Sequence, residues 1–201
     1  DKGFLKLDEI LKSYSKFGSE YIGHPHNTLP GIEMCSGSLG HGLSVSVGMA
    51  LAGKRDGRTY RVYTVMGDGE LAEGSIWEAA MAASQYQLDN LCAAVDRNRL
   101  QISGGTEEVM HQDDVAARFE SFGWNVVNVA DGNDVSQLAQ ALDAAEECKG
   151  RPTLIIANTV KGYGSLIMEN KASWHHHVPT EEEYRQISES FRRKLEEAEH
   201  E

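Results

Sequence analysis

The sequence is short of cysteine, of proline and of long hydrophobic runs. Its 201 residues include 3 cysteines and 4 prolines. Cys35, Cys92 and Cys148 lie far apart and lack CxxC spacing, which argues against a disulfide framework or a zinc site and favours reduced thiols. No apolar stretch approaches the roughly 20 residues that span a bilayer, and no signal peptide opens the chain. We therefore expect a soluble, cytoplasmic protein without a membrane partner.

The chain also lacks a surplus of positive charge. It has 19 Lys and Arg against 31 Asp and Glu, a formal net charge of −12 and a pI of about 5.1. This balance argues against nucleic acid as a partner, because few cationic groups are available to neutralise phosphates. The length predicts a single α/β domain over 1–201, since a chain of this size buries well over half of its extended surface.

Two apolar runs that end in polar residues organise the middle of the chain. The first covers 62–66 and precedes a GDG sequence at 67–69, and the second covers 91–95 and is soon followed by Asn98. The alternation of such runs with helical patterns predicts a parallel sheet with helices on both faces. Because ligands bind at the carboxyl ends of parallel strands, Asp68 and Asn98 could share one ion. Their carboxylate and amide oxygens suit Mg²⁺ or Ca²⁺, with a diphosphate supplying further oxygens.

A GDG sequence with an asparagine about thirty positions later resembles the thiamine diphosphate motif. Five segments match transketolase in order, and they are Gly23-His24-Pro25, Pro30-Gly31-Ile32-Glu33, Gly37-Ser38-Leu39-Gly40-His41-Gly42, Glu70-Leu71-Ala72-Glu73-Gly74 and Gly162-Tyr163-Gly164-Ser165. GDG alone would be weak evidence, whereas five ordered motifs between about Gly23 and Pro179 are specific. The chain most closely resembles the amino-terminal subunit of the split transketolases, whose two halves are separate chains. The implied fold is the diphosphate-binding fold.

The resemblance implies a set of cofactor and metal contacts. The implied metal ligands are Asp68, Asn98 and the backbone carbonyl of Leu100, although Asn98 could instead be a simple turn residue after a strand. The implied cofactor-binding residues are Gly37, Ser38, Leu39, Gly67, Asp68, Gly69, Glu70, Asn98 and His175. Gly67 and Gly69 lack a Cβ, so their backbone amides can approach an anion closely.

Two histidines are implied to be catalytic. The family histidine at His24 lies over the thiazolium ring of the cofactor and binds hydroxyls of the donor sugar, and imidazole titrates near neutrality, which suits proton transfer. His175 matches a family histidine that contacts the diphosphate and the donor sugar. Without the resemblance, a loop histidine beside a proline would be interpreted as a surface or hydrogen-bonded residue, and His26 keeps that interpretation.

Several positions depart from the family pattern. Ser38 stands where many members have proline, His41 where many have glutamine, and His176 where glycine is usual. The run His175 to His177 suggests metal affinity, but consecutive side chains point apart, which disfavours a zinc site. The amino end looks shortened, because the helical segment and further histidines that the family carries upstream of GHP have no counterpart.

The helix expected after the GDG turn begins near Ser75, which fits a capping box with Glu78. Glu73 has two interpretations: the helix dipole favours a carboxylate there, and the resemblance implies a relay at the subunit interface. Residues 101–114 look like a polar loop. Thr180 and Glu183 fit a second capping box, which opens a terminal helix from about residue 180.

The resemblance implies transfer of a two-carbon ketol unit from a ketose, or a ketose phosphate, to an aldose, dependent on thiamine diphosphate and Mg²⁺ or Ca²⁺. In the family, the glutamate that protonates the aminopyrimidine lies in a pyrimidine-binding domain, which no segment here matches. We therefore expect a carboxyl-terminal partner subunit, in an α₂β₂ heterotetramer. Two alternatives are another thiamine diphosphate enzyme, of the 2-oxo acid dehydrogenase or deoxyxylulose phosphate synthase type, and a noncatalytic homologue. The sugars stay open.

Overall fold

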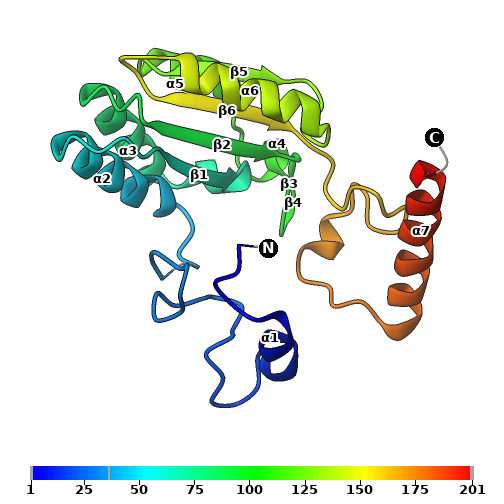
Figure 1. The fold of residues 1–201 in the computed structure, drawn as a ribbon. Helices are drawn as coiled ribbons and strands as arrows, with labels where there is room; N and C mark the ends of the chain where they lie inside the picture. Colours follow the sequence, from blue (N-terminus) through cyan, green and yellow to red (C-terminus); the bar gives the residue numbers. More distant parts are fainter. Residues whose placement is uncertain (1, 36, 200–201) are drawn as a thin grey trace.

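The computed structural model describes residues 2–35 and 37–199 and contains a four-stranded parallel sheet, which lies in the upper part of the view of Figure 1. The strand order is β1-β2-β6-β5, and the bounds are Val62–Gly67 for β1, Leu91–Arg97 for β2, Asn125–Val129 for β5 and Thr153–Asn158 for β6. All pairings within this sheet are parallel, and Gly67 is paired with Asp96. The carboxyl ends of β1 and β2 are therefore neighbours, as the sequence predicts.

Helices cover both faces of the sheet. The larger hydrophobic core lies on one face under α2 (Gly42–Arg55), α3 (Gly74–Gln85) and α5 (Val115–Ser121). On the other face, α6 (Val135–Glu147) packs against β5 and β6 around a smaller core. No helix among residues 2–35 and 37–199 is long and apolar enough to cross a membrane.

Successive strand residues point alternately into the two cores. In β2, Leu91, Ala93 and Val95 belong to the larger core, whereas Cys92 belongs to the smaller one. Strands buried on both faces are apolar almost throughout, because both sides must exclude water. The edge strand β1 differs, since Val65 on the α6 face is 75% exposed. A groove of about 470 Å³ runs along this less covered face between β1 and α6.

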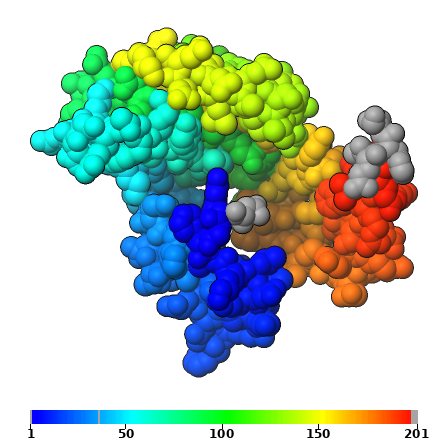
Figure 2. Space-filling model, viewed as in Figure 1, coloured from blue at the N-terminus to red at the C-terminus, as the bar shows by residue number. Residues whose placement is uncertain are grey.

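Two further segments flank the sheet. The first contains α1 (Leu7–Ser13) and the loop that leads to α2, and the second contains η2 (Ala172–His175) and α7 (Glu181–Glu199). Figure 2 shows these segments as two lobes below the sheet layer, with the surface hollowed between them. The β3–β4 hairpin, which follows β2, lies between the two lobes in the view of Figure 1.

Three local expectations can be compared with the structure. The capping box at Thr180 is confirmed, because its N–H donates to Glu183 Oε2 at 2.8 Å and its Oγ1 accepts from the Glu183 N–H at 3.3 Å. The capping box at Ser75 is wrong, since α3 has Glu73 at its N-cap without a side-chain cap. The expected polar loop contains a hairpin and a short helix, and their bounds are Leu100–Gln101 for β3, Gly104–Gly105 for β4 and Thr106–Val109 for α4.

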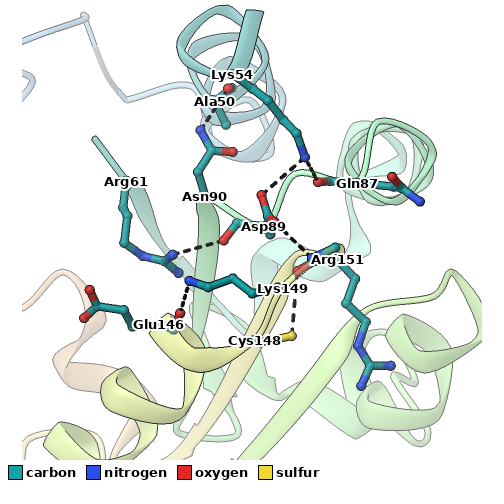
Figure 3. Close-up of polar contacts among 11 residues, drawn as sticks. Ala50, Lys54, Arg61, Gln87, Asp89, Asn90, Glu146, Cys148, Lys149 and Arg151 are labelled. Carbon is teal, nitrogen blue, oxygen red and sulfur yellow. Dashed lines mark hydrogen bonds and ion pairs between the residues drawn. The ribbon is translucent and has the colours of Figure 1, made fainter. Parts of the chain in front are cut away.

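A polar network joins the turns at the amino ends of the strands (Figure 3). Asp89 lies at its centre, and its carboxylate accepts from the Gly150 N–H at 2.9 Å and from Lys54 Nζ at 3.3 Å. Arg61 donates to the carbonyls of Asp89 and Ala145 at 3.1 and 2.9 Å. The hydrogen bond from the Gly150 N–H lowers the pKa of Asp89 most strongly. Partial burial raises this pKa, and Lys54 lowers it further.

Candidate functional site

Asp68 directly follows β1, and its side chain turns toward the connection between β2 and β3. Its N–H donates to the Asp96 carbonyl at 3.2 Å, and its carboxylate accepts from the Gly69 N–H at 2.8 Å and from the Arg99 N–H. The residue is only 4% exposed. Burial raises the pKa of this carboxyl, and the amide hydrogen bonds from Arg99 and Gly69 oppose that rise. A buried carboxylate thus lies at the carboxyl end of the sheet, where the sequence places it.

Asn98 lies in the turn that Asp68 binds. Its Oδ1 accepts from the Leu100 N–H at 3.0 Å, and its Nδ2 donates to Asp96 Oδ1 at 3.2 Å. These are the local contacts of a turn asparagine. They do not conflict with metal binding, because an amide oxygen has two lone pairs and one N–H uses only one of them. The structure therefore places Asp68 next to the turn of Asn98 and Leu100, which brings the three predicted metal ligands into one region.

The donors in this region fit a hard divalent cation. They comprise one carboxylate, one amide oxygen and one backbone carbonyl, which is a set typical of Mg²⁺ and Ca²⁺ sites. Within the part of the chain that the structure describes, no ion pair compensates Asp68, and no three His, Cys, Asp or Glu side chains form a metal-binding group. A cation here would therefore depend on oxygens from a ligand, and a diphosphate supplies such oxygens.

The loop before α2 is held against the GDG turn. Glu70 Oε1 accepts from the Gly40 N–H at 2.8 Å, and Glu70 Oε2 accepts from the Gly67 N–H at 3.1 Å. The Ser75 hydroxyl donates to the Gly40 carbonyl at 2.7 Å, which explains why it does not cap α3. Gly40 has φ of 82°, and a Cβ on it would lie 2.6 Å from the Cβ of the exposed Glu73, so glycine is needed there.

His24 lies on the same loop region. A Cβ at Gly37, where φ is 124°, would lie 2.8 Å from His24 Cδ2, so the imidazole ring packs on the Gly37 backbone. Ser38 Oγ lies 3.2 Å from His41 Nδ1, and Leu39 is 67% exposed. The GHP motif and the loop that the resemblance assigns to the cofactor rings therefore form one surface. Ser36, which begins that loop, lies outside the described residues.

His175 lies on the other flanking segment. It ends η2, which packs against β3 and so lies beside Leu100. Its ring is exposed and makes an edge contact with the ring of His176, with centroids 4.9 Å apart. Partial desolvation lowers the pKa of His175, and the positive charges of Lys161 and His176 lower it further. The neutral imidazole is therefore favoured.

Gln101 is part of this region, although none of the sequence motifs includes it. A Cβ on Gly69 would lie 3.0 Å from Gln101 Cβ, so the hairpin approaches the GDG turn as closely as glycine permits. Gln101 Oε1 is buried and has no hydrogen-bond partner among the described residues. The sequence could have indicated Gln101 as part of the site, because it directly follows the predicted ligand Leu100 and precedes the turn-forming stretch 103–105.

Comparison with known proteins gives a consistent family. Residues 2–197 match the family model described as "Transketolase, thiamine diphosphate binding domain". One subunit of the apulose-4-phosphate transketolase of Phocaeicola vulgatus is 46% identical over 200 residues, which cover 100% of this chain and 70% of the relative. The 6-deoxy-6-sulfo-D-fructose transketolase subunit SqwG of Clostridium sp. is 38% identical over 182 residues, which cover 90% of this chain and 66% of the relative. Human transketolase is 45% identical over 177 residues, which cover 87% of this chain and 27% of the human protein. The chain thus spans only part of each relative.

Solved structures agree with this result. A transketolase variant from Pichia stipitis in complex with fructose 6-phosphate superposes with a TM-score of 0.85 at 35% identity, over 90% of this chain and 29% of that one. Transketolase from Campylobacter jejuni gives a TM-score of 0.85 at 31% identity, with the same coverage of 90% and 29%. The predicted α/β fold is confirmed.

Proposed function

Because the chain belongs to the transketolase family, in which it matches the thiamine diphosphate binding domain, we propose that it is the amino-terminal subunit of a split transketolase. The proposed reaction is transfer of a two-carbon ketol unit from a ketose, or a ketose phosphate, to an aldose. Two relatives are named as subunits of transketolases that use different sugars, so the substrate stays open. The proposal is carried by one observation, the buried Asp68 carboxylate bound to the turn of Asn98 and Leu100.

We assign the metal to Asp68, Asn98 and the Leu100 carbonyl. Burial penalises the Asp68 charge, and a divalent cation would compensate it. Gly67 and Gly69 have no side chains that would keep a diphosphate away from this turn. Their N–H groups, however, already donate to Glu70 and Asp68, so the expected amide contacts with the anion are not free. When bound, thiamine diphosphate supplies the electron sink for breaking a carbon–carbon bond. The residues of this chain hold that group, orient the sugar and move protons.

His24 and His175 are the residues that we assign to the sugar. Both side chains are exposed; His24 packs on the Gly37 loop, and His175 ends η2, which contacts β3. Because its pKa is lowered, His175 is neutral at pH 7 and can accept a hydrogen bond or a proton from a sugar hydroxyl. His24 supplies a second group that can donate or accept.

We also propose a partner subunit that carries the pyrimidine-binding domain, in an α₂β₂ assembly. The matched family model covers the thiamine diphosphate binding domain, and the family's activating glutamate lies in the pyrimidine-binding domain. Glu73 is exposed at the start of α3, which makes its carboxylate available for the interface relay implied by the resemblance. Without the partner, the cofactor would bind but would not be activated.

Calorimetry and a ketol-transfer assay test this function. We expect the chain to bind thiamine diphosphate in Mg²⁺ but not in excess EDTA, and to transfer ketol units only when the partner is added. Equal binding in EDTA would contradict the metal assignment, and ketol transfer by the chain alone would contradict the partner requirement. Turnover of pyruvate in place of a ketose would indicate another thiamine diphosphate enzyme, and binding without any turnover a noncatalytic homologue.

A further inference from the structure

Glu70 directs both of its carboxylate oxygens to backbone amides of its own chain. One oxygen accepts from the Gly40 N–H at 2.8 Å and the other from the Gly67 N–H at 3.1 Å. The resemblance implies a cofactor contact for this residue, but these two hydrogen bonds point the carboxylate at the chain. Glu70 lies within η1 (Gly69–Ala72), the turn that follows Asp68.

The two amides belong to different ends of the proposed cofactor site. Gly67 ends β1 and directly precedes the metal ligand Asp68. Gly40 ends the loop whose Gly37 packs on His24, which is the end assigned to the rings of the cofactor. One side chain therefore joins the metal and diphosphate end to the ring end, across a separation of thirty residues between Gly40 and Glu70.

Only a glutamate can make both contacts. Two N–H donors need two acceptor oxygens, and a carboxylate supplies them. Glutamine has a single acceptor oxygen, and its NH₂ group would face one of the N–H donors. Aspartate keeps both oxygens and the charge, but its side chain is one methylene shorter and cannot reach both amides from the same backbone position.

Other contacts at Gly40 act in the same direction. Its carbonyl accepts from the Ser75 hydroxyl at 2.7 Å, and the position has no room for a Cβ beside Glu73. The residues that fix Gly40 therefore all lie in the short segment 70–75, which is built onto the carboxyl end of β1. Movement of this loop relative to Asp68 is thereby restricted.

We propose that Glu70 is a positioning residue that sets the separation between the two ends of the thiamine diphosphate site. This inference rests on the proposed function. In this role Glu70 acts through the Gly40 and Gly67 amides rather than through a contact of its own with the metal or the cofactor. A ligand that spans both ends depends on Glu70, whereas a ligand that occupies only the diphosphate end does not.

The test measures by calorimetry the binding of two probes, thiamine diphosphate and inorganic pyrophosphate, in the presence of Mg²⁺. The proteins compared are the 201-residue chain and its Glu70→Asp and Glu70→Gln variants. Loss of a residue that orients binding groups weakens affinity on the order of tenfold to a hundredfold, and we expect this loss for thiamine diphosphate in both variants. Pyrophosphate affinity should stay unchanged in Glu70→Asp, which keeps the charge. Glu78→Gln is the matched control, because Glu78 is an exposed glutamate on α3.

Hydrogen exchange gives a readout that does not depend on any ligand. We expect faster exchange at the Gly40 and Gly67 amides in both Glu70 variants and no change in Glu78→Gln. Equal loss of affinity for both probes in Glu70→Asp would mean direct contact or general unfolding and would overturn the proposal, as would unchanged exchange at the two amides. If the unmodified chain fails to bind thiamine diphosphate while Glu70 still protects both amides, the proposed function is wrong. The structural role of Glu70 in joining the Gly40 loop to the GDG turn is then still supported.

Discussion

Asp68 carries a charge at a position that disfavours it. The residue is 4% exposed, and burial raises its pKa more than the amide hydrogen bonds from Arg99 and Gly69 lower it. A raised pKa in the folded state means that the ionised carboxylate lowers stability above that pKa, and this cost disappears as the pH falls through it. Such a cost is typical of residues kept for binding, because a bound cation would compensate the charge.

We expect Asp68→Asn to weaken Mg²⁺-dependent binding of thiamine diphosphate on the order of a hundredfold, because it removes the one carboxylate of the proposed metal set. The thermal midpoint at neutral pH should change little, because the neutral amide avoids the cost of burying a charge but can accept from only one of the two N–H groups of Gly69 and Arg99. Calorimetry and thermal unfolding measure the two effects. The exposed Asp56→Asn variant is the control, and retained metal dependence in Asp68→Asn would disprove the assignment.

At the scale of single elements, α7 combines a side-chain cap with contacts to the buried Gly164 of the preceding loop. Phe191 packs on Gly164, where a Cβ would lie 2.7 Å from its ring, and Lys194 donates to the Gly164 carbonyl at 3.0 Å. The Thr180 N–H, followed by His177, lowers the pKa of Glu183 to about 2. The helix therefore depends on one carboxylate at its start and on a few contacts near its end.

We expect Glu183→Gln to increase hydrogen exchange in the first turn of α7, because glutamine loses the charge that the Thr180 N–H and His177 bind. In the unmodified chain, the lowered pKa means that the cap is fully formed above pH 4.5 and is lost as the pH falls through about 2. Glu181→Gln in the same turn serves as the control. Equal exchange in the two variants would show that the cap does not hold the helix start.

At the scale of the whole molecule, the two ends of the sheet have different tasks. The carboxyl end holds the proposed site, with a buried charge and close backbone approaches. The amino end holds the polar network around Asp89, which joins the turns that lead into β1, β2 and β6 (Figure 3). Stability supplied at one end can therefore offset the cost of the buried Asp68 charge at the other.

We expect Asp89→Asn to lower the free energy of unfolding by about 1–2 kcal/mol, because the amide cannot accept from both Gly150 and Lys54 as a carboxylate does. The loss should be largest at neutral pH. Since the pKa of Asp89 is lowered in the folded chain, its stabilisation is present above the ordinary value of 3.8 and disappears as the pH falls through the folded value. Denaturant unfolding at two pH values measures this, with Asp143→Asn on the exposed side of α6 as control. Thiamine diphosphate affinity should stay unchanged, and a parallel loss of affinity would contradict the separation of the two ends.

The elements of the sheet could be predicted because their signals are local. The run at 62–66 and the run at 91–95 are apolar and end in polar residues, and they form β1 and β2 with neighbouring carboxyl ends. The cap at Thr180 also involves residues only three positions apart. In contrast, the hairpin at 100–105 was missed, because strands of two residues carry no periodic pattern.

The sequence by itself determined the fold class, the family and the candidate residues Asp68, Asn98, His24 and His175, because periodicity and motif spacing can be determined without knowing which residues are in contact. Only the tertiary structure decided how Ser75 and Glu70 are used. Ser75 binds the Gly40 carbonyl, 35 positions away, rather than capping its own helix, and Glu70 binds Gly40 across thirty positions. The physical reason is that a hydroxyl or a carboxylate has several compatible partners, and the path of the folded chain decides which of them is brought within hydrogen-bonding distance.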